Sequence, residues 1–154
     1  MKELAHALFA FIFCAAVYEL AVPAKANSPL MLLSGTVAMA LASIPDLDLR
    51  SPLRLIRHRS GVSHSIFTIA TCALLSYVIL FRYPLLDLFV TAAVTSALAS
   101  HVILDSLTTS GCPLFWPLSS RRFSARLCRS DSPLANALIV LFCLFTILVV
   151  LLCS

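Results

Sequence analysis

The chain has 154 residues, of which 60% are hydrophobic and only 12% are charged, and its formal net charge is +4. Soluble domains of this length are about half apolar and about a quarter charged, so an ordinary soluble protein is excluded and a single membrane domain over residues 1–154 is expected. The positive charge does not indicate a nucleic-acid partner, because the large basic clusters lie beside apolar stretches and reflect membrane orientation.

Apolar stretches predict an all-α, polytopic fold with about five transmembrane helices. In chain order they cover about residues 4–22, 29–45, 65–82, 85–104 and 134–153, compared with about 20 residues for a full span and about 17 as a lower limit. Pro23, Pro29, Pro84 and Pro133 lie at the connections, where a residue without a backbone N–H does least harm.

The first stretch contains His6, one turn from its start. A lone histidine on an apolar helix is as readily a packed residue as a ligand, so both interpretations of His6 stay open. The sequence Ala24-Lys25-Ala26 after this stretch resembles a signal-peptide cleavage site. The weakly basic start of the chain and the length of the apolar run argue against cleavage.

Carboxylates follow the second stretch, in the sequence Ile44-Pro45-Asp46-Leu47-Asp48. The spacing of Asp46 and Asp48 allows both to meet one cation, although Pro-Asp is also ordinary turn chemistry.

Two histidines six residues apart, His58 and His64, lie in a basic segment before the third stretch. Gly61 between them allows the chain to fold back on itself. A basic loop at the membrane surface explains the neighbouring arginines better than it explains the histidines. Ser63 or Ser65 can also cap the third helix.

His101 and Asp105, at the end of the fourth stretch, are spaced i, i+4, which places imidazole and carboxylate on one helix face. Both side chains can therefore ligate one ion, although a hydrogen-bonded His–Asp pair is the simpler alternative. After them, the segment from Cys112 to Leu118 is too short and too rich in proline for a further span, and it suits an interfacial element with Trp116 as anchor.

Arginines are concentrated in the loops 46–64 and 105–133, whereas 23–28 and 82–84 carry one basic residue each. The positive-inside rule therefore places the two longer loops and the N-terminus in the cytoplasm, and the C-terminus outside. This topology of a multi-pass cell-membrane protein brings seven potential ligands to the cytoplasmic face: His6, Asp46, Asp48, His58, His64, His101 and Asp105.

Imidazole and carboxylate ligands suit zinc, with manganese or iron(II) as alternatives. The cysteines form no CxxC pair, so neither a cysteine zinc site nor a disulfide framework is expected. A divalent ion with an open coordination position would activate a water molecule. The residues expected to contact a phosphate-bearing substrate are Arg57, Arg59, Ser63, Thr108 and Thr109.

These motifs resemble the YdjM-like family, catalogued as membrane-bound metal-dependent hydrolases and as a domain of unknown function. The family pattern combines an N-terminal His with the elements (L/I)PDxD, HR-G-x-(T/S)-H-S and SHxxxDxxTxxGxPLxWP. The sequence matches it with His6, Ile44 to Asp48, His58 to Ser65, and Ser100 to Pro117. It departs from the pattern in Ser60, an additional residue between Arg59 and Gly61.

The family is also distantly similar to the zinc-dependent phospholipase C and nuclease group, all-helical phosphoesterases that use Asp, His and an HxxxD helix. This resemblance implies a metal-dependent hydrolase of a phosphoester or lipid headgroup bond, acting at the cytoplasmic membrane face. It implies a catalytic metal set of Asp46, His64, His101 and Asp105, supported by His6, Asp48 and His58. The further HxxxE helix of those enzymes has no counterpart here.

Two alternatives remain at this stage: a divalent-metal carrier or sensor, and a membrane protein whose metal site is only structural. The expected partners are the lipid bilayer and a phospholipid or phosphoester substrate, and the sequence does not indicate an oligomeric state.

Overall fold

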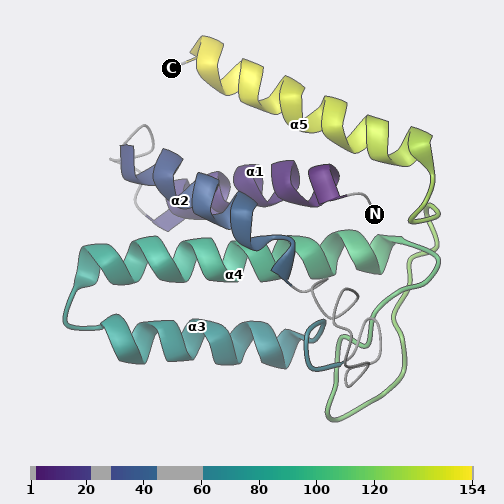
Figure 1. The fold of residues 1–154 in the computed structure, drawn as a ribbon, viewed down its shortest axis with the longest axis horizontal. Helices are drawn as coiled ribbons and strands as arrows, with labels where there is room; N and C mark the ends of the chain where they lie inside the picture. The colour runs from purple at the N-terminus through teal and green to yellow at the C-terminus, as the bar shows by residue number, and fades with distance from the viewer. Residues whose placement is uncertain (1–2, 22–28, 45–60, 154) are drawn as a thin grey trace.

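The computed structural model describes residues 3–21, 29–44 and 61–153. These residues form five α-helices and no β-strand: α1 (Glu3–Ala21), α2 (Pro29–Leu41), α3 (Ile66–Leu80), α4 (Pro84–Leu107) and α5 (Pro133–Cys153). The predicted all-α fold is confirmed, and each predicted apolar stretch overlaps one helix (Figure 1).

Proline and serine fix where the helices begin. Pro29, Pro84 and Pro133 are each the first residue of a helix, where the fixed φ of proline suits the helix and its missing N–H costs no hydrogen bond. Ser65 caps α3, with its hydroxyl oxygen accepting a hydrogen bond from the backbone N–H of Thr68 at 3.2 Å.

Two helix ends differ from the prediction by at least three residues. Helix α2 ends at Leu41 rather than at residue 45, and a short turn follows. Helix α4 continues to Leu107, beyond the last apolar residue of the predicted stretch, so Asp105 lies inside the helix.

The helices are stacked in layers with α4 at the centre (Figure 1). Helix α4 packs against α1, α2 and α3, whereas α5 packs against α1. The start of α1, the start of α3 and the end of α4 lie at the same end of the bundle (Figure 1). Residues far apart in the sequence therefore meet at this end.

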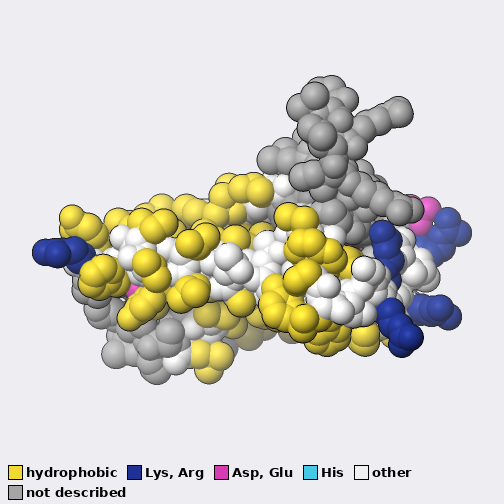
Figure 2. All heavy atoms as spheres, turned by 90° about the horizontal axis from the view of Figure 1, so that it is seen from below, with side chains coloured by type: hydrophobic (Ala, Val, Ile, Leu, Met, Phe, Trp, Pro, Cys, Tyr) yellow, Lys and Arg dark blue, Asp and Glu magenta, His cyan; other side chains and the backbone are white. Residues whose placement is uncertain are grey.

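Small residues fill the contacts between α1, α2 and α4, and large apolar residues point outward. The buried residues include Ala10, Cys14, Ala38, Ala93 and Ala97. The exposed residues include Leu74, Ile79, Leu141, Phe145 and Leu152. Figure 2 shows apolar side chains over much of one face. Small residues at helix contacts and large apolar residues outside are typical of helices packed within lipid.

Two segments, Glu3–Leu20 and Leu86–Leu107, are long and apolar enough to cross a membrane by length and composition. The helices Pro29–Leu41, Ile66–Leu80 and Pro133–Val149 are also apolar but shorter.

The connection between α4 and α5 folds back along the end of α4. Cys112 and Phe123 exchange two backbone hydrogen bonds of 3.0 and 2.9 Å, and the N–H of Ala125 donates to the carbonyl of Ser106 at 2.8 Å. Gly111 allows the reversal, because its φ of +59° lies in the left-handed region that favours glycine.

The same connection also contacts the start of α3. The backbone N–H of Ile66, at the first position of α3, donates to the carbonyl of Leu114 at 2.9 Å. Trp116 lies directly against Gly61, where an added Cβ would come within 2.1 Å of the indole Cγ. The tryptophan thus occupies the space that a side chain at position 61 would need, and it stays 36% exposed.

Candidate metal centre

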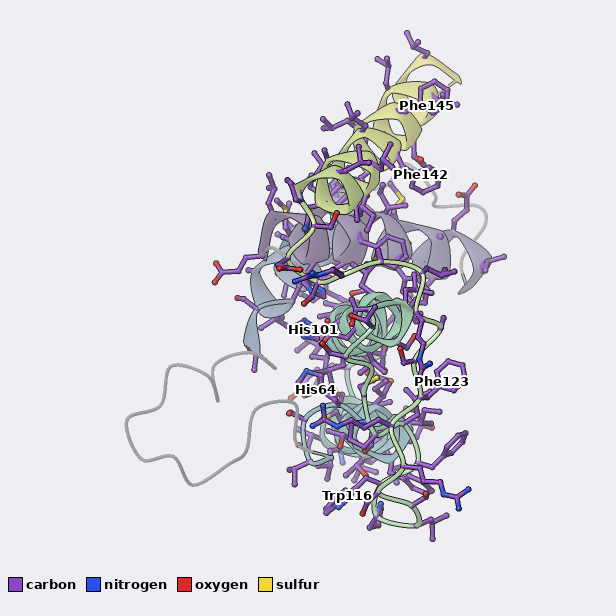
Figure 3. All side chains as sticks on the ribbon, turned by 90° about the vertical axis from the view of Figure 1, so that its right-hand side faces the viewer. His64, His101, Trp116, Phe123, Phe142 and Phe145 are labelled. Carbon is purple, nitrogen blue, oxygen red and sulfur yellow. The ribbon has the colours of Figure 1, made fainter. Side chains whose placement is uncertain are left out.

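Four ionisable side chains meet at the end of the bundle where α1 begins and α4 ends. His6 comes from α1, His64 from the turn before α3, and both His101 and Asp105 from α4. Each of the four is at most 1% exposed. Figure 3 shows His101 on α4 and His64 close to it on the side of α3.

The Asp105 carboxylate is the common neighbour of the three imidazoles. His6 Nε2 lies 3.7 Å from Asp105 Oδ1, and the Nε2 atoms of His64 and His101 lie 3.6 and 3.8 Å from Oδ2. The rings also contact one another. His6 stacks on His101 with centroids 4.1 Å apart, and His64 meets His101 edge to face at 5.2 Å.

Local hydrogen bonds orient two of the rings. His101 Nδ1 donates to the carbonyl of Ala42 at 2.8 Å, because a carbonyl oxygen only accepts. In the neutral ring this leaves the lone pair on Nε2, the atom directed at Asp105. The hydroxyl of Ser63 lies 2.7 Å from His64 Nδ1 and holds that ring with its Nε2 directed at Asp105. Such contacts behind the ligand atoms are typical of metal-binding histidines.

The distances in the cluster suit a shared cation. Separations of 3.6–3.8 Å exceed the range of about 2.7–3.2 Å for direct N–H···O hydrogen bonds. Two ligand atoms bound to one tetrahedral zinc ion at about 2.0–2.1 Å lie about 3.3 Å apart. A modest contraction of the cluster around an ion would produce this geometry.

His6, His101 and Asp105 form a possible metal-binding triad, because their ligand atoms all lie within 4.8 Å of one another. His64 approaches the same carboxylate from the side of α3 and adds a further nitrogen. The donor set of imidazoles and one carboxylate fits zinc, manganese or iron(II). Burying the charged carboxylate among apolar helices costs roughly several kcal/mol of folding free energy, unless a positive charge beside it offsets this cost. A divalent cation would provide that charge.

The structure brings together only some of the residues singled out from the sequence. His6, His64, His101 and Asp105 lie in the cluster. The predicted ligands or substrate contacts Asp46, Asp48, Arg57, His58 and Arg59 lie outside the described residues.

The remaining three residues expected to contact substrate have structural partners. Ser63 orients the His64 ring. Thr108 is buried, and its hydroxyl and backbone N–H both donate to the Asp105 carbonyl, at 2.8 and 3.2 Å. Thr109 is exposed, and its backbone N–H donates to the carbonyl of Cys128 at 2.9 Å. In this conformation Ser63 and Thr108 support the ligand residues.

Sequence reasoning did not reveal the Ala42 carbonyl that orients His101. A backbone carbonyl leaves no signal in residue types, and this one is supplied from 59 positions away. His6 had two signals, its depth in the first apolar stretch and its match to the N-terminal His of the family pattern, and the structure places its ring in stacking contact with His101.

Comparison with curated proteins identifies two similar archaeal chains. A stretch of 60 residues is 35% identical to the uncharacterized proteins ORF4' and ORF4 of Methanothermobacter thermautotrophicus. The match covers 39% of this chain and 23% and 22% of those proteins, so the chain spans less than a quarter of their length.

No solved structure matches the chain. The family description "YdjM inner membrane protein" matches residues 1–154, which is the whole chain. The outward-facing apolar residues agree with the membrane location in that description. The chain therefore belongs to the YdjM inner membrane protein family and associates with the lipid bilayer.

Proposed function

We propose that this protein is a membrane-bound hydrolase that uses a divalent metal ion to cleave a phosphoester or related bond at the level of the lipid headgroups. One observation carries the proposal: the Nε2 atoms of three buried histidines lie 3.6–3.8 Å from the buried Asp105 carboxylate. The resemblance of the His101–Asp105 helix to the HxxxD helix of zinc-dependent phosphoesterases supports the reaction class.

His6, His101 and Asp105 would hold the ion, with His64 as a further ligand. When bound, the ion supplies Lewis-acid activation of water and of the scissile group. The protein orients its ligands beforehand, since Ala42 holds His101 and Ser63 holds His64. Zinc is the preferred ion for this donor set, and Asp46, Asp48 and His58 remain proposed ligands of the same centre.

The position of the cluster along the helices favours a hydrolase over a carrier. His6 is the fourth residue of α1, and Asp105 is the third from the end of α4. Both helices run without a break through these ligands. Carriers typically bind their ions near the bilayer midplane on interrupted helices, whereas this cluster lies where headgroups would be reached.

We further propose that all five helices cross the membrane and that the cluster faces the cytoplasm. Arg121, Arg122, Arg126 and Arg129 lie in the connection that folds over the end of α4. The turn between α3 and α4, at the other end, carries Arg82 alone. This asymmetry supports a cytoplasmic cluster by the positive-inside rule.

The test is a hydrolysis assay on purified protein, with soluble phosphoesters and phospholipids as substrates. We expect turnover that chelation abolishes and zinc restores, and that Asp105→Asn reduces by a factor of roughly a hundred or more. Asp87→Asn, at the opposite end of the same helix, should keep wild-type activity and serves as the matched control.

Two results would count against this function. Wild-type turnover in Asp105→Asn would mean that the cluster takes no part in the hydrolysis. Metal-dependent flux into proteoliposomes, without hydrolysis of any phosphoester, would favour a carrier instead.

A further inference from the structure

A basic and apolar surface lies beside the metal centre, on the connection between α4 and α5. Arg121, Arg122 and Arg126 are exposed on it, and so are Leu118 and Leu127, with 80% and 73% of their surface accessible. We call these five residues the arginine-leucine surface. Figure 2 shows most of the described basic side chains at one end of the molecule, near apolar side chains, and a further one at the opposite end.

This surface is held in place by the backbone that carries it. The two hydrogen bonds between Cys112 and Phe123 fix the chain next to Arg122. The N–H of Leu127 donates to the carbonyl of Leu107 at 3.0 Å, which fixes the chain next to Arg126. The backbone next to Arg122 and Arg126 is therefore already held against the end of α4. Less conformational entropy is lost when these arginines bind a ligand, because their backbone is fixed beforehand.

The positive charge of the surface is not neutralised within the described part of the chain. The nearby acid, Asp131, pairs with Arg129 through contacts of 3.1 and 3.2 Å. Hydrogen bonds from Arg129 hold the pKa of Asp131 below its ordinary value, which keeps this pair ionised. Among the described ion pairs none involves Arg121, Arg122 or Arg126.

We propose that the arginine-leucine surface binds the phosphate groups of anionic phospholipids. Guanidinium groups match phosphate oxygens in a bidentate geometry. The neighbouring Leu118 and Leu127 side chains would enter the acyl region just below those phosphates. A soluble phosphate or a nucleic acid would leave the two leucines in water, whereas a lipid accounts for both kinds of side chain. The proposal requires only the membrane location and does not depend on the metal centre.

The single tryptophan of the chain, Trp116, provides a probe within the same connection. The protein is reconstituted into vesicles of phosphatidylcholine and phosphatidylglycerol, and Trp116 fluorescence is quenched by brominated forms of either lipid. The ratio of the two quenching efficiencies reports the preference for the anionic lipid near this surface. We expect the wild type to prefer phosphatidylglycerol clearly.

The combined variant Arg121→Gln, Arg122→Gln, Arg126→Gln should lose this preference by on the order of tenfold, since each arginine near an anionic surface contributes up to about fivefold. The control Arg82→Gln removes the exposed arginine at the opposite end of the helices and should change nothing. Leu118→Ser with Leu127→Ser should weaken quenching by both lipids and keep their ratio.

An unchanged preference in the triple variant, or an equal loss in Arg82→Gln, would overturn the proposal. So would complete competition by soluble glycerol phosphate, because that would identify a site for free anions. Metal content separates this proposal from the hydrolase. The triple variant should keep its metal, whereas Asp105→Asn should lose metal and keep the lipid preference.

Discussion

At the scale of single residues, the centre depends on how each imidazole is held. The Ala42 carbonyl and the Ser63 hydroxyl contact the Nδ1 atoms of His101 and His64 and leave each Nε2 directed at Asp105. The three histidines come from separate segments of the chain, so the cluster forms only when α1, α3 and α4 have packed. Metal binding and folding should therefore be linked.

Ser63→Ala tests the orienting role of the hydroxyl. The change removes the 2.7 Å contact with His64 Nδ1, and loss of such a supporting contact typically lowers metal affinity by about 10- to 100-fold. Zinc titration of the purified variant measures this loss. Ser76→Ala is the control, because the Ser76 hydroxyl donates to the Cys72 carbonyl within α3, away from the cluster. Equal zinc affinity in wild type and Ser63→Ala would contradict an orienting role for Ser63.

The candidate site could be predicted in part from the sequence. The i, i+4 spacing brings His101 and Asp105 to one face wherever they lie in a helix, and the structure contains that helix. The residues alone did not show whether His6 is a ligand or a packed side chain, since a single histidine carries no spacing pattern. Its stacking on His101 results from the packing of α1 against α4, which is a tertiary contact.

At the scale of the elements, the connection between α4 and α5 depends on Gly111. The φ of Gly111 is +59°, and an added Cβ would lie 2.3 Å from the carbonyl oxygen of Phe123. Gly111→Ala should therefore destabilise the protein by more than the roughly 1–2 kcal/mol of left-handed strain alone. Thermal unfolding in detergent measures the effect, with the exposed neighbour Ser110→Ala as control. An unfolding midpoint for Gly111→Ala equal to that of Ser110→Ala would contradict the requirement for glycine at position 111.

The contact between Gly61 and Trp116 joins that connection to the turn before α3. An added Cβ at position 61 would come within 2.1 Å of the indole, so Gly61→Ala alone should cost at least about 1–3 kcal/mol through overpacking. In a Trp116→Ala background the same change should cost less than about 0.5 kcal/mol. A double-mutant cycle of unfolding free energies measures the difference. If the destabilisations of Gly61→Ala and Trp116→Ala were simply additive, the indole would not be what limits the space at position 61.

The helices were easier to predict than their connection. Long apolar runs and the prolines at positions 29, 84 and 133 indicate helix starts directly. Hydropathy alone predicts that α4 ends at Leu104, although Asp105 and Ser106 continue it to Leu107. The pairing of Cys112 with Phe123 is a contact between distant backbone groups, which has no periodic signal in the sequence.

At the scale of the whole molecule, the apolar residues are distributed for a lipid environment. Small residues allow α1, α2 and α4 to approach closely, and the large side chains of α3 and α5 face outward. The polar cluster and the exposed arginines of the α4–α5 connection lie at one end of this apolar body. That separation is what the proposed orientation in the membrane requires.

Reporter fusions test the proposed orientation. A reporter active only outside the cytoplasm is joined after Arg82 or after Ser130 in chains truncated at those points, so that the second fusion keeps the arginines of the connection. Because Arg82 lies in the α3–α4 turn and Ser130 follows the arginines of the connection, we expect activity from the first fusion and none from the second. A reporter active only in the cytoplasm should give the opposite pattern. Equal activity at the two points would contradict a crossing by α4.

The metal content of the purified protein tests the central claim most directly. Elemental mass spectrometry is applied to the wild type, Asp105→Asn and Asp87→Asn after saturation with zinc and removal of free ions. We predict about one or more ions per chain in the wild type and in Asp87→Asn, and less than about a tenth of that in Asp105→Asn. A wild type that retains no ion, or a folded Asp105→Asn protein that retains the full amount, would contradict the account.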